Sequence, residues 1–309
     1  MKKLFFIFLL SASLLLGQGI SVSRAPVPLT GGDERYALGK FSPDGRFALL
    51  SHKGYATIEL VEMAASKSSI ITSNSPGAGW GMRWNGSGDR FIFKVNGSTQ
   101  AGTKTVELYE YTDGAGLAKV ADLDPAANNL AFYSLNGNGI TTEGSEGKPH
   151  VIRNSESASS VNYYVTNGKL KIIDPDGKLS PGTPAMIELK ENVLFAEWSP
   201  SGKRLALHSA GEGITVFDLA SGTAHRFPGS EYPSWINDDY LTFMATEDDG
   251  YTMLNSEVIV AKFDGSASEI VTRDFSPAAM WPSADRNGDL LFTGADGKIY
   301  LMKVDFPKN

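Results

Sequence analysis

Residues 195–207 read Phe195-Ala196-Glu197-Trp198-Ser199-Pro200-Ser201-Gly202-Lys203-Arg204-Leu205-Ala206-Leu207. A short apolar segment, a tight turn and a second apolar segment follow one another, which is typical of two antiparallel strands joined by a turn. The same phrase recurs at 41–49 as Phe-Ser-Pro-Asp-Gly-Arg-Phe-Ala-Leu and at 84–92 as Trp-Asn-Gly-Ser-Gly-Asp-Arg-Phe-Ile. Looser copies lie at 235–243 and 281–292.

Repeats of strands alone, spaced roughly 40–50 residues apart, are the signature of β-propeller blades. The composition agrees, with 33 Gly and no sustained helical periodicity. We predict an all-β chain that forms a six-bladed propeller of four-stranded antiparallel blades. Residues 136–160 are rich in Gly, Ser, Asn and Glu, and we interpret them as an insertion in the third blade. The alternative is that they supply strands of an additional blade, which would give seven blades.

The last repeat runs out of chain. Its third strand is expected at 299–304, and the sequence ends at Asn309 before a fourth strand can form. A short apolar segment, Val27-Pro28-Leu29-Thr30, lies ahead of the first repeat. We predict that it supplies the missing strand, because an N-terminal strand there would close the ring and cover an open sheet edge.

The N-terminus is typical of a signal peptide. Lys2 and Lys3 precede an apolar run from Leu4 to Leu16, and Gly17 and Gly19 provide a small-residue cleavage pattern. We predict a signal peptide at 1–19 and a single propeller domain at 20–309; the alternative is an uncleaved anchor. The chain has no cysteine, which leaves no disulfide, no thiolate nucleophile and no lipid-modified cysteine. The expected location is periplasmic or secreted, without membrane insertion after cleavage.

The net charge restricts the partners. The chain carries 35 acidic and 28 basic residues, a formal charge of −7. Nucleic acids and anionic membranes need clustered Lys and Arg, so neither is expected as a partner. We expect a monomer that recognises a protein or peptide, and a basic one because the chain is acidic.

The tandem turns of the form Trp/Phe-Ser-Pro-Asp/Ser-Gly-Lys/Arg, each followed by an apolar strand, resemble the repeats of TolB-like β-propellers. The similarity extends over the sequence that follows the predicted signal peptide, with its best copies at 41–49, 84–92 and 198–207. It implies the propeller fold, and propellers of this kind occur as protein-binding modules in the bacterial envelope. Others accompany peptidases, and a few are enzymes. The sequence shows no counterpart of the separate domain that precedes the propeller in TolB, so only the propeller is carried over.

No catalytic signature accompanies the repeats. The sequence has no Gly-x-Ser-x-Gly elbow, and its four histidines, His52, His150, His208 and His225, include no pair at metal-ligand spacing. Asp285, Asn287 and Asp289 alternate as in a calcium loop, but the Gly and distal Glu of an EF-hand are missing, so we interpret them as a turn. We predict no enzyme activity, no catalytic residue, no cofactor and no metal.

Sorting the loops by face gives the candidate site. In a four-stranded blade, the loops between strands two and three and the loops between blades open at the same end of the ring. Acids and aromatics gather in those loops, and such a rim suits a basic partner, because charge steers the encounter and aromatics anchor it. The predicted partner-binding residues are Asp33, Glu34, Tyr55, Trp80, Glu212, Glu231, Tyr232, Asp248, Asp249, Tyr251, Asp274 and Phe275. The alternative is a propeller enzyme or carbohydrate-binding protein with paired carboxylates over the central channel.

Overall fold

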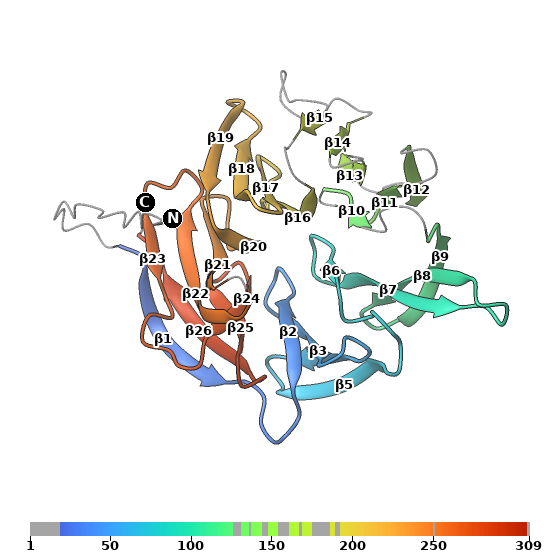
Figure 1. The fold of residues 1–309 in the computed structure, drawn as a ribbon, viewed down its shortest axis with the longest axis horizontal. Helices are drawn as coiled ribbons and strands as arrows, with labels where there is room; N and C mark the ends of the chain where they lie inside the picture. The colour runs from blue at the N-terminus through green and yellow to red at the C-terminus, as the bar shows by residue number, and fades with distance from the viewer. Residues whose placement is uncertain are drawn as a thin grey trace.

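The computed structural model describes residues 19–125, 131–135, 137–143, 148–153, 161–166, 169–174, 186–188, 192–249 and 251–307. These residues form strands and turns, with no helix among them. The strands make antiparallel sheets that stand around a central channel as the blades of a propeller (Figure 1). The predicted all-β propeller fold is therefore confirmed. The predicted signal peptide lies outside the described residues, apart from Gly19.

Five blades have four strands each. In chain order, their strands are β2 (Tyr36–Phe41), β3 (Phe47–His52), β4 (Ile58–Glu62) and β5 (Lys67–Thr72) in blade 1; β6 (Arg83–Trp84), β7 (Arg90–Ser98), β8 (Lys104–Thr112) and β9 (Gly116–Leu123) in blade 2; β16 (Val193–Trp198), β17 (Arg204–Ser209), β18 (Gly213–Asp218) and β19 (Thr223–Phe227) in blade 5; β20 (Ser230–Trp235), β21 (Tyr240–Asp248), β22 (Met253–Lys262) and β23 (Ser268–Ile270) in blade 6; and β24 (Ala279–Ala284), β25 (Asp289–Gly294), β26 (Ile299–Asp305) and β1 (Ser21–Pro28) in blade 7.

Two blades have three described strands each. They are β10 (Phe132–Tyr133), β11 (Ile140–Glu143) and β12 (Pro149–Arg153) in blade 3, and β13 (Asn162–Thr166), β14 (Lys169–Ile173) and β15 (Met186–Glu188) in blade 4. The described strands thus form seven sheets, which matches the seven blades considered from the sequence as the alternative to six. Residues 136–160, interpreted above as an insertion, contribute β11 and β12 to blade 3. Ile140 is fully buried, which is the role of a core strand and not of an inserted loop.

Blade 4 runs in the opposite direction to the other blades. The Val161 carbonyl accepts a hydrogen bond from the Leu135 amide, and the Asn162 side-chain amide donates to the Phe132 carbonyl. These contacts place the start of β13 beside the end of β10, so the inner strands of blades 3 and 4 are antiparallel. With three strands each, blade 3 ends at one face of the disc and blade 4 returns the chain to the other, where β16 begins.

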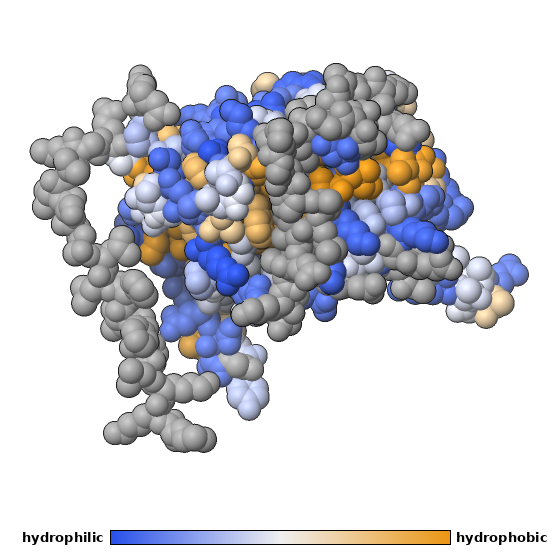
Figure 2. Space-filling model, turned by 90° about the horizontal axis from the view of Figure 1, so that it is seen from above, coloured by the Kyte–Doolittle hydropathy of each residue, from blue (hydrophilic) through white to orange (hydrophobic). Residues whose placement is uncertain are grey.

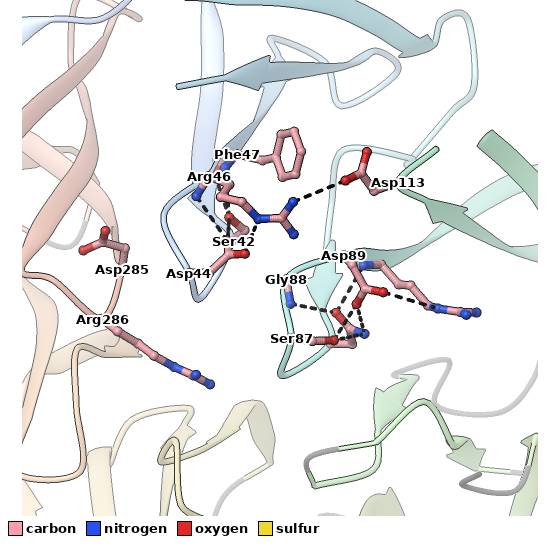
Figure 3. Close-up of polar contacts among 12 residues, drawn as sticks. Ser42, Asp44, Arg46, Phe47, Ser87, Gly88, Asp89, Asp113, Asp285 and Arg286 are labelled. Atoms are coloured by element: carbon pink, nitrogen blue, oxygen red, sulfur yellow. Dashed lines mark hydrogen bonds and ion pairs between the residues drawn. The ribbon is translucent and has the colours of Figure 1, made fainter. Parts of the chain in front are cut away.

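In five blades, the turn between the first two strands is held by the side chain at its first position. The Ser42 hydroxyl accepts a hydrogen bond from the Phe47 amide, and the Asn85 side-chain oxygen accepts from Gly88 and Arg90 (Figure 3). Oxygen-bearing side chains satisfy the otherwise free amides of a tight turn, which explains why Ser, Asn or Asp recurs there. The equivalent side chains that accept backbone amide bonds elsewhere in the ring are Ser134, Ser199 and Asp285. In blade 6 the first position is Ile236, and the next residue, Asn237, accepts the Asp239 and Tyr240 amides instead.

The core lies between neighbouring blades. Apolar clusters join blade 1 to blade 2, for example Leu49 and Ile58 with Phe91, and blade 6 to blade 7. Two of the repeat tryptophans also hydrogen-bond to the preceding blade, since Trp84 donates to the Lys40 carbonyl and Trp235 to the Glu197 carbonyl. Seen from the side of the disc, apolar patches lie between hydrophilic surfaces (Figure 2). The inter-blade packing sets the width of the channel and the positions of the loops at its two ends.

The ring closes as predicted. β1, which begins earlier than expected at Ser21, pairs antiparallel with β26, from Ser21 opposite Asp305 to Pro28 opposite Tyr300 (Figure 1). The Leu29 amide then donates to the Ile299 carbonyl at 2.8 Å. Blade 7 is therefore built from both ends of the described chain.

Candidate functional site

The predicted partner-binding loops share one end of the ring, which we call the acidic end. Three of the predicted residues there form an aromatic cluster. The Trp80 ring, 42% exposed, lies on the loop from β5 to β6 and meets Tyr55 edge-on with 5.4 Å between ring centroids. Tyr232 lies 6.5 Å from Trp80. Trp281, which opens the looser repeat at 281–292, joins the cluster, 5.9 Å from Trp80 and 4.0 Å from Tyr232.

The backbone at this cluster is strained. Tyr55, Tyr232 and Trp281 have positive φ angles of 59°, 52° and 56°. Residues other than Gly rarely occupy this region, which costs of order 1–3 kcal/mol each and is concentrated at functional sites. The described chain has two further non-Gly residues with positive φ, Ser66 and Asn74. All three aromatic members of this set therefore belong to one cluster.

Two β-bulges aim the aromatic side chains. The register of β20 with β21 shifts between Glu231 and Ser234, and that of β24 with β25 shifts between Met280 and Ser283. Each shift contains an aromatic residue followed by proline, Tyr232-Pro233 and Trp281-Pro282. A bulge re-aims a side chain that regular alternation would direct elsewhere. The repeated aromatic-Pro-Ser sequence was a signal for the position of Trp281 that strand alternation alone does not provide.

Negative charge lies beside the aromatics. Burial raises the pKa of the Glu231 carboxyl, and the neighbouring Asp248 carboxylate raises it further. Burial also raises the pKa of the Tyr232 hydroxyl to about 12, with a smaller contribution from Glu231. Two carboxyl groups that already repel one another gain from a cation placed between them. This part of the acidic end therefore suits a Lys or Arg side chain.

The hairpin formed by β21 and β22 extends the acidic end outward. Its tip carries Asp248, Asp249 and Tyr251, and the Tyr251 side chain is 96% exposed. The Asp249 carboxylate accepts hydrogen bonds from the Tyr251 and Thr252 amides, which lower its pKa. Met253 and Leu254, not predicted from the sequence, are exposed beside them. Exposed apolar side chains among acids are typical of a contact surface.

The remaining predicted residues take several positions. Asp33 and Asp274 are exposed, and Glu212 is half-buried in the turn between β17 and β18. Glu34 is exposed and bonds to His52 at 2.9 Å. Phe275 packs edge-on against Phe292 and Tyr300 and belongs to the core of blade 7. Its ring is thus committed to folding contacts in this structure.

His208 lies under the cluster. Its ring contacts Tyr232 with 5.3 Å between centroids, its side chain is buried, and Nδ1 has no hydrogen-bond partner among the described residues. Burial lowers the pKa of the imidazole to about 4. In the unfolded chain the His208 imidazole has its ordinary pKa of about 6.5, so the unfolded chain is protonated at this residue before the folded chain as the pH falls.

The resulting pH dependence is testable. Because the folded pKa of His208 is the lower one, its stabilising contribution is complete above about pH 6.5 and is lost as the pH falls towards 4. We expect the free energy of unfolding to drop by about 2 kcal/mol through this residue between about pH 7.5 and 5. Urea unfolding at both values, compared with His208→Leu, should show a smaller drop in the variant. Equal drops in both proteins would contradict the assignment.

The channel interior carries charges that the sequence analysis did not identify. Three charged residues of the inner strands face the channel, each two positions before the side chain at the first position of the repeated turn. They are Lys40, Arg83 and Glu197. The Arg83 guanidinium donates from Nη1 to the Ala196 carbonyl across the ring at 3.0 Å and lies over the Phe132 and Phe195 rings. Lys40 also lies over Phe195, with its Nζ 5.0 Å from the ring centroid.

Enclosure dominates the electrostatics of these three groups. Burial lowers the pKa of Lys40 and of Arg83 and raises that of Glu197, while the opposite charges partly offset each shift. Among the described residues that line the channel cavity, Glu197 is the single carboxylate. Paired carboxylates for acid–base work on a sugar, the alternative considered from the sequence, therefore do not meet there in the described part of the chain.

Comparisons with known proteins reveal similarity in fold. No family model matches the sequence, and no curated protein matches it significantly. The structure is similar to the β-propeller domain of Cps50 (Swd1) from Myceliophteria thermophila, with a TM-score of 0.55 and 11% identity over 93% of this chain and 100% of that one. It is also similar to a putative TolB from Agrobacterium tumefaciens, with a TM-score of 0.52 and 15% identity over 91% and 93% of the two chains. The expected resemblance to TolB-like propellers is confirmed for the fold. The described residues include no helix with the length and hydropathy of a membrane span.

Proposed function

We propose that this chain is an exported, non-enzymatic binding module that recognises a basic protein or peptide at its acidic end. The observation that carries the proposal is the aromatic cluster of Tyr55, Trp80, Tyr232 and Trp281, three of whose members have positive φ. A fold retains strain of this kind where the surrounding structure imposes it, and such strain is concentrated at functional sites. Trp80 is the exposed member and would be the anchor.

The charges beside the cluster support a basic partner. Glu231 and Asp248 repel one another next to Tyr232, and Asp249 lies on the adjacent hairpin tip. A Lys or Arg side chain from a partner would relieve that repulsion while its neighbours contact the aromatic rings. Acidic rims also accelerate association with basic partners, and this acceleration falls with ionic strength. Export to the periplasm or beyond the cell rests on the sequence at 1–19.

Replacement of Trp80 tests the anchor. The chain would be immobilised and exposed to an extract of its native cell envelope, and the captured protein would be titrated against variants. Trp80→Ala should weaken binding by about 2 kcal/mol, or roughly 30-fold, because aromatic anchors dominate interface energies. The matched control is Leu117→Ala, since Leu117 is also 42% exposed but lies near the opposite face of blade 2.

The acids are tested separately. A variant with Glu231→Gln, Asp248→Asn and Asp249→Asn should associate more slowly at low salt and lose most of the salt dependence of the association rate. Binding that is unchanged in both this variant and Trp80→Ala would place the contact elsewhere on the ring. Failure of the unaltered chain to capture any protein would refute the proposed function.

A further inference from the structure

The channel contains a cavity at the end opposite the acidic one. It has a volume of about 140 Å³ and is lined by inner-strand residues of all seven blades and by their repeated turns. A single water needs about 10–15 Å³ of such space, so the cavity is roughly ten times larger. Pro43, Gly86, Pro200 and Arg286 belong to the turns, which places the opening at the turn end of the ring. The volume limits an occupant to a small molecule or an inserted side chain.

Positive charge predominates in the cavity lining. Lys40, Arg83 and Arg286 are cationic, and Glu197 is the single described anion among the lining residues. Arg286 extends from its turn towards the turn between β6 and β7, where its Nη2 donates to the Gly86 carbonyl at 2.9 Å (Figure 3). This excess of positive charge is opposite in sign to the net charge of the whole chain, which is −7. The cavity lining is therefore positive in a chain whose net charge is negative.

Two buried donors in the lining lack partners. Arg83 is 7% exposed, and its Nη2 has no hydrogen-bond partner among the described residues; the same holds for the Trp198 indole nitrogen. Buried donors are almost always paired, and a free buried guanidinium nitrogen costs more than a neutral one. Glu197 Oε2 is not the missing acceptor for these donors, because it has no hydrogen-bond donor itself among the described residues. An acceptor that carries negative charge would satisfy the guanidinium.

We propose that this cavity binds a small oxyanion, a phosphate or carboxylate group, which enters between the repeated turns and accepts hydrogen bonds from the Arg83 guanidinium. Guanidinium pairs both kinds of oxyanion with two parallel N–H bonds. Arg286 attracts the anion at the opening, and Lys40 adds positive charge inside. Glu197 opposes the anion and thereby limits its affinity. The site is separate from the aromatic cluster and independent of the protein-binding role.

The test is titration of the full chain with sodium phosphate and with sodium succinate, each at ionic strength matched with sodium chloride. Binding would be followed by calorimetry and by tryptophan fluorescence, because Trp84, Trp198 and Trp235 line the cavity. Saturation with phosphate alone, or with succinate alone, identifies which oxyanion the site accepts. No saturable binding of either probe would overturn the proposal, since the unpaired donors would then be satisfied by water only.

Three variants locate the site. Arg286→Gln should weaken binding about tenfold, and Arg83→Lys, which keeps the charge but loses the fork, by about the same factor. Glu197→Gln should tighten binding several-fold, because it removes the opposing charge. The control is Arg46→Gln, which removes an exposed arginine from the same face, outside the cavity lining, and should change the affinity less than twofold.

The contrast between Arg286→Gln and Arg46→Gln decides the outcome, since both are surface substitutions that leave the core intact. Equal affinity in Arg286→Gln, Glu197→Gln and the unaltered chain would overturn the proposal, as would an equal loss in Arg46→Gln. Trp80→Ala should leave oxyanion binding unchanged, and Arg286→Gln should leave partner capture unchanged. The oxyanion proposal and the proposed protein-binding function can therefore be refuted separately.

Discussion

Deletion of residues 21–30 is expected to lower the melting temperature by about 10 °C and to make the protein self-associate. The deletion removes β1, which supplies the outer strand of blade 7. It also removes the Leu29 and Thr30 contacts with Ile299 and the ion pair between Arg24 and Asp289, whose atoms are 2.6 Å apart. Several ladder hydrogen bonds at about 1 kcal/mol each give a loss of about 3–5 kcal/mol, and each kcal/mol corresponds to about 2–4 °C.

The self-association follows from the edge that the deletion exposes. Without β1, the strand β26 presents free amides and carbonyls from Ile299 to Asp305, which can pair with another chain. Calorimetry would measure the melt, and gel filtration the association. A peptide of residues 19–31 added in trans should restore both properties, because it can occupy the vacant edge. An unchanged melting temperature would show that blade 7 does not need its fourth strand.

Arg83→Ala is expected to destabilise the protein by about 3–5 kcal/mol, the effect typical of breaking a buried charge arrangement. The guanidinium donates to the Ala196 carbonyl and lies 4.4 Å and 4.7 Å from the Phe132 and Phe195 ring centroids. It therefore ties blade 2 to blades 3 and 5 across the channel. Its removal leaves a void, and it leaves Glu197 with Lys40 as its remaining enclosed counter-charge.

Urea unfolding monitored by tryptophan fluorescence would measure the loss. Arg46→Ala provides the comparison, because Arg46 makes exposed ion pairs with Asp44 and Asp113, and such pairs contribute about 0–1 kcal/mol. If Arg83→Ala were no more destabilising than Arg46→Ala, Arg83 would not hold the blades together. Glu197→Gln should destabilise less than Arg83→Ala, because it preserves the shape and size of the side chain.

The sequence predicted the propeller because its turns need particular side chains. Ser42 and Ser199 recur in recognisable phrases, since an oxygen at the first turn position accepts the amides of the turn. Blade 3 was harder to identify because its turn lacks the Ser-Pro and Lys/Arg signals, although Ser134 occupies the same capping position. Capping chemistry survives there after the rest of the phrase has changed.

The candidate site was predicted only in part. The sequence placed Tyr55, Trp80 and Tyr232 at the same end of the ring, because the direction of the strands determines the end at which each loop lies. Trp281 was not among the predicted residues, because a bulge in β24 shifts its register and a bulge cannot be read from regular strand alternation. The channel charges had a signal that was not used. Lys40, Arg83 and Glu197 each precede the aromatic residue that opens a repeated turn, so equivalent positions of three blades converge on the axis.

The reversed direction of blade 4 implies a parity rule for this architecture. Each strand carries the chain from one face of the disc to the other, so a blade with an odd number of strands delivers it to the wrong face. Blades 3 and 4 have three described strands each, and the second restores what the first inverts. Loss of a single strand elsewhere would turn every following blade upside down and exchange its loops between the acidic end and the turn end. Strands of such a ring can therefore be lost only in pairs. When the two losses fall in adjacent blades, the fewest loops move from one face of the disc to the other.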